Sequence, residues 1–258
     1  MAKEGLTMER RQAHESKKKA DVLVIVPAYN EAAGIRGTIE SIRRLAPYAD
    51  IVVVNDGSAD DTGCQAEMEG VPVLNLGCNL GIGGAVQSGY RYAEENGYAY
   101  AAQIDGDGQH NPADLAALLQ AMKERGADMV VGSRFIERRG FQSTFARKLG
   151  ITLLARLASA LTGQRITDPT SGYRLCGRRA IALFAREYPV DYPEVEALVL
   201  LDNHRGSFIE VPVVMSERQG GVSSISAMKS AYYMAKVILA VLMTKTKKKR
   251  DWSIGYGN

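Results

Sequence analysis

The sequence lacks the features that mark secreted or membrane-spanning proteins. Its three cysteines, Cys64, Cys78 and Cys176, have neither paired nor metal-ligand spacing, which favours a reducing cytoplasm over a secretory route. No apolar signal core precedes Ala20, which argues against export. No run reaches the ~18 to 20 uncharged apolar residues that span a bilayer. We therefore expect a cytoplasmic protein without a transmembrane segment.

A strong net charge is also lacking, although the overall value of +3 hides a division along the chain. Residues 1–19 carry +3 and residues 244–258 carry +4, so the body between them is mildly acidic. Two interpretations of the basic ends stay open, namely solvated tails or contacts with an anionic membrane surface. The body has no evident basic face with interleaved aromatic residues, so nucleic acid is not an expected partner.

The body of the chain alternates short apolar runs with helical patterns. The 258 residues, 46% of them hydrophobic, are enough to bury a sizeable core. The patterns predict strands at 21–27, 51–54, 71–74, 98–104 and 129–131, and helices at 32–45, from 60 or 61, at 81–95 and at 112–125. This alternation predicts an α/β fold with a mostly parallel central sheet flanked by helices. The polar clusters that follow the strands should then meet along one edge.

One of these polar clusters has the chemistry of a metal site. It reads Asp105-Gly106-Asp107-Gly108-Gln109-His110. Two carboxylates with an amide oxygen suit a hard cation such as Mg²⁺ or Mn²⁺, whose usual task is to neutralise phosphates. The same glycine-rich pattern is also ordinary turn chemistry, so both interpretations stay open on these residues alone.

A dinucleotide-binding loop is absent. The glycines Gly81, Gly83 and Gly84 tempt such an interpretation, but the third glycine of the fingerprint would fall at Val86. No glycine loop follows the first predicted strand either. A nicotinamide enzyme is therefore disfavoured.

Seven motifs stand in one order between residues 20 and 225. They are Val26-Pro27-Ala28-Tyr29-Asn30-Glu31, Val54-Asn55-Asp56-Gly57-Ser58-Ala59-Asp60, Asn79-Leu80-Gly81, Asp105 to His110, Gly132-Ser133-Arg134, Asp168-Pro169-Thr170-Ser171-Gly172-Tyr173-Arg174, and Arg218-Gln219-Gly220. With these motifs the chain resembles the family 2 glycosyltransferases of GT-A fold (the nucleotide-diphospho-sugar transferase fold). Within them it is similar to the dolichol-phosphate-mannose-synthase-like enzymes.

The resemblance implies a binding site for a nucleoside-diphosphate sugar. The donor-binding residues it implies are Pro27, Tyr29, Glu31, Asn55, Asp56, Gly81, Asp105 and Gly106. Carboxylates can accept hydrogen bonds from ribose hydroxyls and a base amide, while Pro27 shapes the wall. The implied metal ligands are Asp105, Asp107 and Gln109, holding Mg²⁺ or Mn²⁺ on the donor diphosphate.

The resemblance also implies phosphate-binding arginines, which suit bidentate recognition of phosphate. Arg134 matches an arginine near the acceptor phosphate, Arg147 is a second candidate, and Arg218 matches a late loop that closes over the diphosphate. That loop often continues with a lysine in the family, where this chain has Val222.

The residues implied to act in catalysis are Asp107, Asp168 and Arg134. Asp168 would be a general base if the acceptor were a hydroxyl, which must lose a proton. A phosphate monoester is already an anionic nucleophile, and Asp168 would then be a structural residue. His110 is interpreted either as a metal ligand or as a hydrogen-bonded loop histidine.

Two apolar stretches predict amphipathic C-terminal interface helices. In 144–161 apolar residues recur every fourth position, and 227–243 is apolar before a basic tail. The alternative for each is a core or dimer helix. The expected domains are a flexible basic leader over 1–19, the GT-A catalytic domain over 20–225, and an interface or dimerisation helix with its tail over 226–258.

The implied activity is metal-dependent, inverting transfer of a sugar from a nucleoside diphosphate to a polyprenyl phosphate, by a protein peripheral on the cytoplasmic membrane face. A polysaccharide or other hydroxyl acceptor is the first alternative. A non-catalytic nucleotide-sugar-binding partner of a membrane subunit is the second, and a nucleotidyltransferase is the last. A membrane-protein partner and a homo-oligomer stay open.

Overall fold

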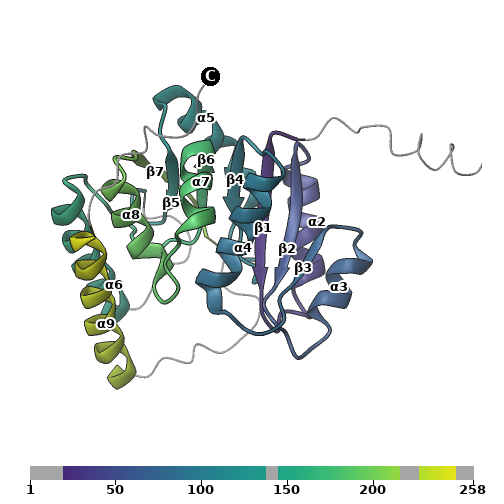
Figure 1. The fold of residues 1–258 in the computed structure, drawn as a ribbon, viewed down its shortest axis with the longest axis horizontal. Helices are drawn as coiled ribbons and strands as arrows, with labels where there is room; N and C mark the ends of the chain where they lie inside the picture. The colour runs from purple at the N-terminus through teal and green to yellow at the C-terminus, as the bar shows by residue number, and fades with distance from the viewer. Residues whose placement is uncertain (1–19, 138–144, 216–226, 248–258) are drawn as a thin grey trace, which may run out of the picture.

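A computed structural model describes residues 20–137, 145–215 and 227–247, with side chains from Lys148 and Met234 onward in the last two ranges (Figure 1). The described strands form one sheet of seven in the order β3-β2-β1-β4-β6-β5-β7. Their bounds are β1 Val22–Ala28, β2 Ala49–Asn55, β3 Val73–Asn75, β4 Tyr100–Gln103, β5 Met129–Ser133, β6 Arg174–Gly177 and β7 Phe208–Pro212. Only β6 runs antiparallel to its neighbours, which confirms the predicted mostly parallel sheet.

Helices cover both faces of this sheet (Figure 1). One face packs against α4 (Gly81–Glu95), α7 (Arg178–Arg186) and α8 (Pro193–Asn203). The other packs against α2 (Ile35–Leu45) and α5 (Leu115–Arg125), while α3 (Thr62–Met68) lies beside β3. At the far end α6 (Phe145–Thr162) and α9 (Ala227–Thr246) lie side by side and contact α8.

The strand β1 shows why an apolar run becomes the centre of such a sheet. All seven of its residues are buried, as expected for a parallel strand covered on both faces. Leu23 and Ile25 belong to the core on one face, and Val24 and Val26 to the core on the other, because side chains alternate along a strand. Gly89 allows the close approach of α4, since a Cβ there would lie 2.3 Å from Cγ2 of Ile25.

Several boundaries differ from the prediction. The first helix begins at Ile35 instead of residue 32, because the carbonyl of Glu31 accepts the amides of Gly34 and Ile35 and closes a turn first. The helix at 112–125 opens as a short 3₁₀ turn, Pro112–Asp114, and α5 follows it. The elements β6, α7, α8 and β7 were not predicted.

The described helices include none that is long and apolar enough to cross a membrane.

Candidate active site

A pocket of about 390 Å³ opens at the C-terminal ends of β1, β2 and β4. The strand order reverses between β1 and β4, and ligands of open α/β sheets bind at such a switch point. The lining residues are Pro27, Ala28, Tyr29, Glu31, Asp56, Asn79, Gly81, Ile82, Ala85, Asp105, Gly106 and Asp107. The pocket therefore gathers eight of the predicted site residues from four separate segments of the chain: Pro27, Tyr29, Glu31, Asp56, Gly81, Asp105, Gly106 and Asp107.

The loop after β1 is fastened to the loop after β2. Asn30 has a left-handed backbone with φ of 55°, and its side-chain oxygen accepts the amide of Ala59. The amide of Glu31 donates to Oγ1 of Thr62 at 2.8 Å. These contacts hold Glu31 at the pocket wall, and Tyr29, 49% exposed, lies on its open side.

Asp56 joins the second loop to the start of α4. Its carboxylate is buried and accepts the amide of Leu80, the N-cap residue of α4, at 2.7 Å. A negative charge at a helix N-terminus is stabilised by the helix dipole. Gly57 permits this approach, because its φ is 66° and a Cβ would lie 2.7 Å from the amide of Asn79.

Asn55 does not line the pocket, although it was predicted to bind the donor. Its side chain donates to Oδ1 of Asn75 and accepts the amide of Ser58. These contacts join β2 to β3 and fix the turn that presents Asp56. The donor-binding role of Asn55 stays a prediction.

Asp105 is held by groups on both sides of the loop. Nε2 of Gln103 donates to Oδ1 of Asp105 at 2.9 Å, and the backbone amide of Asp105 donates to Nδ1 of His110 at 3.1 Å. The imidazole of His110 is buried and stacks on Tyr173 with ring centroids 5.0 Å apart. Burial raises the pKa of Tyr173, whose hydroxyl donates to the carbonyl of Asn111, so this tyrosine is a neutral donor.

The carboxylates of Asp105 and Asp107 fit a hard divalent cation in their chemistry. Asp107 is buried, and its Oδ1 accepts the amide of Gln109 at 3.0 Å. No three His, Cys, Asp or Glu side chains of the described residues form a metal-binding group. Mg²⁺ is commonly held by one or two carboxylates together with substrate phosphates, so this pair is sufficient when a diphosphate supplies the remaining oxygens.

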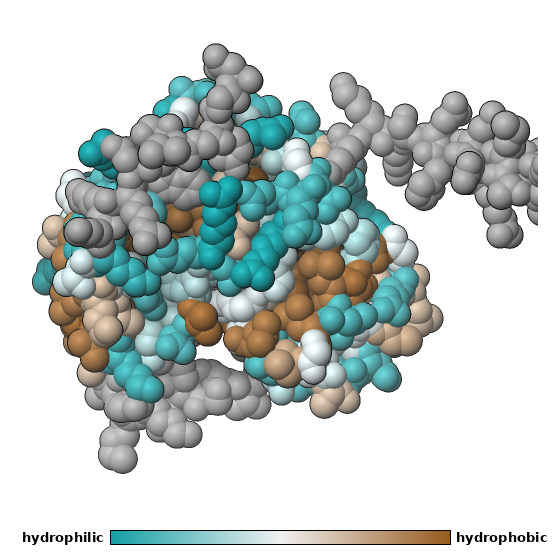
Figure 2. All heavy atoms as spheres, in the orientation of Figure 1, coloured by the Kyte–Doolittle hydropathy of each residue, from teal (hydrophilic) through white to brown (hydrophobic). Residues whose placement is uncertain are grey.

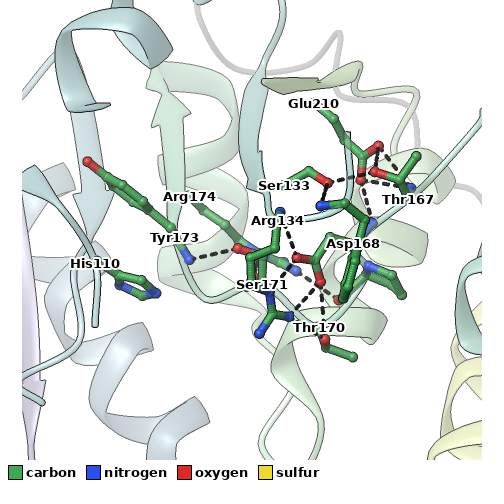
Figure 3. Close-up of polar contacts among 12 residues, drawn as sticks. His110, Ser133, Arg134, Thr167, Asp168, Thr170, Ser171, Tyr173, Arg174 and Glu210 are labelled. Atoms are coloured by element: carbon green, nitrogen blue, oxygen red, sulfur yellow. Dashed lines mark hydrogen bonds and ion pairs between the residues drawn. The ribbon is translucent and has the colours of Figure 1, made fainter. Parts of the chain in front are cut away.

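Arg134 and Asp168 form a second polar centre, shown in Figure 3. The guanidinium donates to both oxygens of Asp168, from Nε and from Nη2, each at 2.7 Å. The backbone amide of Arg134 and the hydroxyl of Thr170 donate to the same carboxylate. Asp168 is fully buried and Arg134 is 14% exposed at its side chain. The pair thus fixes one edge of the guanidinium.

Glu210 on β7 contacts the segment that carries Asp168 (Figure 3). Its carboxylate accepts the amides of Thr167 and Asp168 and the hydroxyl of Thr167. No local pattern indicates this contact, because Glu210 lies 42 residues beyond Asp168. Gln103 had a signal that we missed, since a polar residue two positions before Asp105 lies on the same side of an extended chain.

The loop from Asp168 to Gly172 connects the two centres. A Cβ added at Gly172 would lie 3.1 Å from Oδ2 of Asp105 and 3.1 Å from Nε2 of Gln103. The backbone at Gly172 therefore lies against Asp105, while Asp168, at the other end of the loop, holds Arg134.

A larger groove of about 630 Å³ lies next to Arg134, between α6 and the segment before β6. Its residues are Phe135, Lys148, Ile151, Thr152, Ala155, Arg156, Ser159, Arg165, Ile166 and Thr167. Three are cationic and none is acidic. The groove thus combines positive charge with an apolar floor.

Part of the predicted apolar stripe of α6 is exposed. Leu149 and Leu153 are 66% and 51% exposed, whereas Leu157 and Leu161 are partly buried against the core. On α9, Leu239, Leu242 and Met243 are exposed, and Val237 and Val241 pack into the core. We call Leu149, Leu153, Leu239, Leu242 and Met243 the apolar face. Figure 2 shows hydrophobic side chains along the edge that α6 and α9 occupy in Figure 1.

Two predicted arginines are not placed by the structure. Arg147 belongs to α6, but its side chain lies outside the described residues, as does all of Arg218. Their phosphate-binding roles stay predictions.

Solved structures of other proteins share this fold. Glucosyl-3-phosphoglycerate synthase from Mycobacterium tuberculosis, solved with Mn²⁺, UDP-glucose and phosphoglyceric acid, superposes with a TM-score of 0.67 at 21% identity. The match covers 93% of this chain and 83% of that one. The fold is therefore the GT-A fold of glycosyltransferases.

Sequence comparison narrows the class. The model of glycosyl transferase family 2 matches residues 23–184. Polyprenol monophosphomannose synthase from Mycolicibacterium smegmatis is 32% identical over 225 residues, covering 83% of this chain and 84% of that protein. Undecaprenyl-phosphate mannosyltransferase from Micrococcus luteus is 34% identical over 214 residues, covering 80% and 87%. The chain is a glycosyltransferase. It belongs to glycosyl transferase family 2, as its motifs predicted.

Proposed function

We propose that this enzyme transfers a sugar from a nucleoside-diphosphate sugar to a polyprenyl phosphate, with inversion and with Mg²⁺ or Mn²⁺. The observation that carries the choice of acceptor is the pairing of Asp168 with Arg134. Both oxygens of this carboxylate accept hydrogen bonds from the guanidinium, so Asp168 is poorly available as a base. A phosphate acceptor needs no base, since it is already an anion.

The donor occupies the pocket at the ends of β1, β2 and β4 in this proposal. Tyr29, Glu31 and Asp56 contact the base and ribose, with Pro27 shaping the wall. Asp105 and Asp107 would hold the metal, with Gln109 as a third ligand. When bound, the cation offsets the negative charge that develops on the departing nucleoside diphosphate.

The acceptor occupies the groove beside Arg134. A polyprenyl phosphate has an anionic head on a hydrocarbon chain, and the groove offers both matching surfaces. Lys148, Arg156 and Arg165 supply positive charge, and residues such as Phe135 and Ile151 supply apolar contact. Arg134 directly precedes Phe135 of the groove and orients the phosphate in this proposal, with Arg147 and Arg218 as further phosphate contacts.

The transfer is a single displacement. A phosphate oxygen of the acceptor forms a bond to the anomeric carbon, and the bond from that carbon to the donor diphosphate breaks. The bonding electrons leave with the nucleoside diphosphate. One displacement inverts the anomeric configuration, and no proton has to be removed from the nucleophile.

The enzyme is proposed to work on the cytoplasmic membrane surface, where its acceptor lies. The apolar face of α6 and α9 supports this location, because exposed leucines on adjacent helices fit an interfacial position. The basic segments 1–19 and 244–258 add attraction to anionic lipids. In this arrangement 20–225 is the catalytic domain and 226–258 the interface segment; a homo-oligomer or a membrane-protein partner would use the same face.

Transfer to a hydroxyl acceptor is the second candidate. Phosphoglyceric acid is bound in the solved structure of glucosyl-3-phosphoglycerate synthase, which shares the fold. The names of the two relatives from Mycolicibacterium smegmatis and Micrococcus luteus, in contrast, refer to polyprenol and undecaprenyl phosphate. Their closer sequence similarity supports the lipid phosphate.

The test begins with a thermal-shift panel of UDP-, GDP- and dTDP-sugars with Mn²⁺ or Mg²⁺, since a ligand that binds the folded state raises apparent stability. The donor it selects is then offered with undecaprenyl phosphate, undecaprenol or 3-phosphoglycerate. We expect sugar transfer to the lipid phosphate alone. Transfer to either other acceptor, with none to the lipid phosphate, would overturn the proposal.

A further inference from the structure

Arg174 is a buried cation that no step described above uses. It is the first residue of β6 and is 1% exposed. Its Nε donates to the carbonyl of Ser171 at 2.9 Å, and its Nη2 donates to the carbonyls of Pro169 and Glu194. All three acceptors are neutral. A buried charge is costly without compensation, so a chain that keeps one here gains something from it.

The contacts of Arg174 converge on the loop between the two centres of the active site. Pro169 and Ser171 belong to the loop that carries Asp168 at one end and Gly172 at the other. Figure 3 shows Arg174 next to Ser171 of this loop. The third carbonyl, of Glu194, belongs to the first turn of α8. One guanidinium therefore fastens the loop to a core helix.

The hydrogen-bonding capacity of Arg174 is not exhausted by these contacts. Its Nη1 is buried and has no hydrogen-bond partner among the described residues. A guanidinium has five N–H donors in a rigid fork, and those on Nη1 of Arg174 are left without an acceptor inside the protein. Burial raises the pKa of Glu194, the Arg174 charge opposes that rise, and the Asp105 charge adds to it. Glu194 thus lies within the electrostatic influence of both Arg174 and Asp105.

We propose that Arg174 is a positioning residue for sugar transfer: it holds the loop Asp168–Gly172 so that Asp105 on the donor side and Arg134 on the acceptor side keep a fixed relation. The inference rests on the proposed function for the reaction it serves. Moving the loop displaces Gly172 from Asp105 and Asp168 from Arg134 together. The donor pocket itself is built by other loops and stays formed.

The test compares Arg174→Lys with wild type. Lysine keeps the charge but cannot reach three carbonyls in the geometry of the guanidinium fork. We expect the variant to bind one donor nucleotide per protein molecule with Mn²⁺ at near-normal affinity. Its kcat per binding site should fall about 100-fold, as expected when reacting groups are displaced by roughly 1 Å. Arg179→Lys, at an exposed arginine paired with Asp128, is the matched control and should keep the wild-type kcat.

A purely structural role gives a different pattern. It would lower the number of functional donor sites and the melting temperature, and leave kcat per site unchanged; that result would overturn the inference. If the wild type uses a hydroxyl acceptor instead of the lipid phosphate, the proposed function fails, and the same comparison is made with the acceptor it does use. The two failures are therefore separate.

Gly172→Ala provides a second variant that leaves Arg174 intact, in case the lysine variant does not fold. Its added methyl group would lie 3.1 Å from Oδ2 of Asp105 and should reproduce the loss of kcat, measured at saturating donor because Asp105 also lines the donor pocket. Gly177→Ala, at the last residue of β6, meets only ordinary contacts at 3.6 Å and serves as its control. When both variants fold, their combined loss should be smaller than the product of the single losses. A full multiplicative loss, or a wild-type kcat in Gly172→Ala, would contradict the inference.

Discussion

Asp168 accepts three hydrogen bonds from Arg134, two from the guanidinium at 2.7 Å and one from the backbone amide at 3.1 Å. The arginine is thereby held at both its backbone and its side chain. A carboxylate used in this way orients a cation, and its lone pairs are directed at that cation instead of at a substrate proton. The centre formed by Arg134 and Asp168 thus has the make-up of a rigid anion receptor.

Asp168→Asn should slow transfer because it leaves Arg134 without its anchor. We expect a loss of about 3 kcal/mol in folding stability, as for a broken buried ion pair. Arg134→Lys should slow transfer similarly, and the double variant should be little worse than either single one. Steady-state kinetics and urea unfolding of the three variants measure this.

The pH dependence distinguishes positioning from base catalysis. If Asp168 were a general base, its loss would remove an acidic limb from the profile of kcat against pH. We expect the acidic side of the profile of kcat against pH to have the same shape in Asp168→Asn as in the wild type. Asp202→Asn, at an α8 carboxylate that pairs with Lys245 of α9, is the control and should keep the wild-type rate.

Asp107→Ala should abolish metal-dependent transfer while the fold is kept. The carboxylate lies at the pocket beside Asp105, and hard cations need its oxygen. The variant should also lose the thermal stabilisation that Mn²⁺ with the nucleotide gives to the wild type. Asp61→Asn, at an exposed residue before α3, controls for the general loss of a carboxylate. Full activity in Asp107→Ala would remove the metal assignment.

Asp56→Ala should weaken both the fold and the donor pocket. The variant loses the acceptor for the amide of Leu80 at the start of α4, and loss of a helix cap costs about 1 to 2 kcal/mol. Donor affinity should also fall, because Asn79 and Gly81 line the pocket and flank Leu80, whose amide Asp56 holds. Asp56→Asn keeps an acceptor oxygen and should recover most of the stability. Urea unfolding and donor titration separate the two effects; equal stability of both variants would contradict the capping role.

The sequence predicted those parts of the fold and site that depend on local pattern. The helix at 81–95 has the predicted bounds, because its apolar spacing and its starting glycine are local features. The gathering of Pro27, Asp56 and Asp105 followed from a rule about parallel strands, which needs only the order of elements.

The parts that local pattern missed depend on tertiary contacts. The strand β6 is four residues long and begins with a buried arginine, which reads as a surface residue in any pattern of polarity. The pairing of Asp168 with Arg134 joins residues 34 apart, and nothing in either motif selects the partner. Such pairings decide which carboxylate oxygens stay available to a substrate. The sequence alone therefore left open whether Asp168 is a base or a structural residue.

The apolar face yields the last prediction. Deleting 227–258 would be a poor test of membrane binding, because Val237 and Val241 belong to the core and the hydroxyl of Thr244 donates to Glu196 on α8. Replacing exposed residues avoids this damage. Leu153→Asp combined with Leu242→Asp should leave the melting temperature near that of the wild type.

The same double variant should lose flotation with vesicles that contain anionic phospholipid, because charged side chains disfavour the interface. Transfer to a short, water-soluble polyprenyl phosphate should be kept, since neither residue lines the groove or the donor pocket. Met68→Asp, at an apolar residue of α3 that is 68% exposed against 51% for Leu153 and 41% for Leu242, is the control and should still float. Unchanged flotation of the double variant would mean that the apolar face does not bind lipid. Loss of transfer to the soluble acceptor would instead place that face in acceptor recognition.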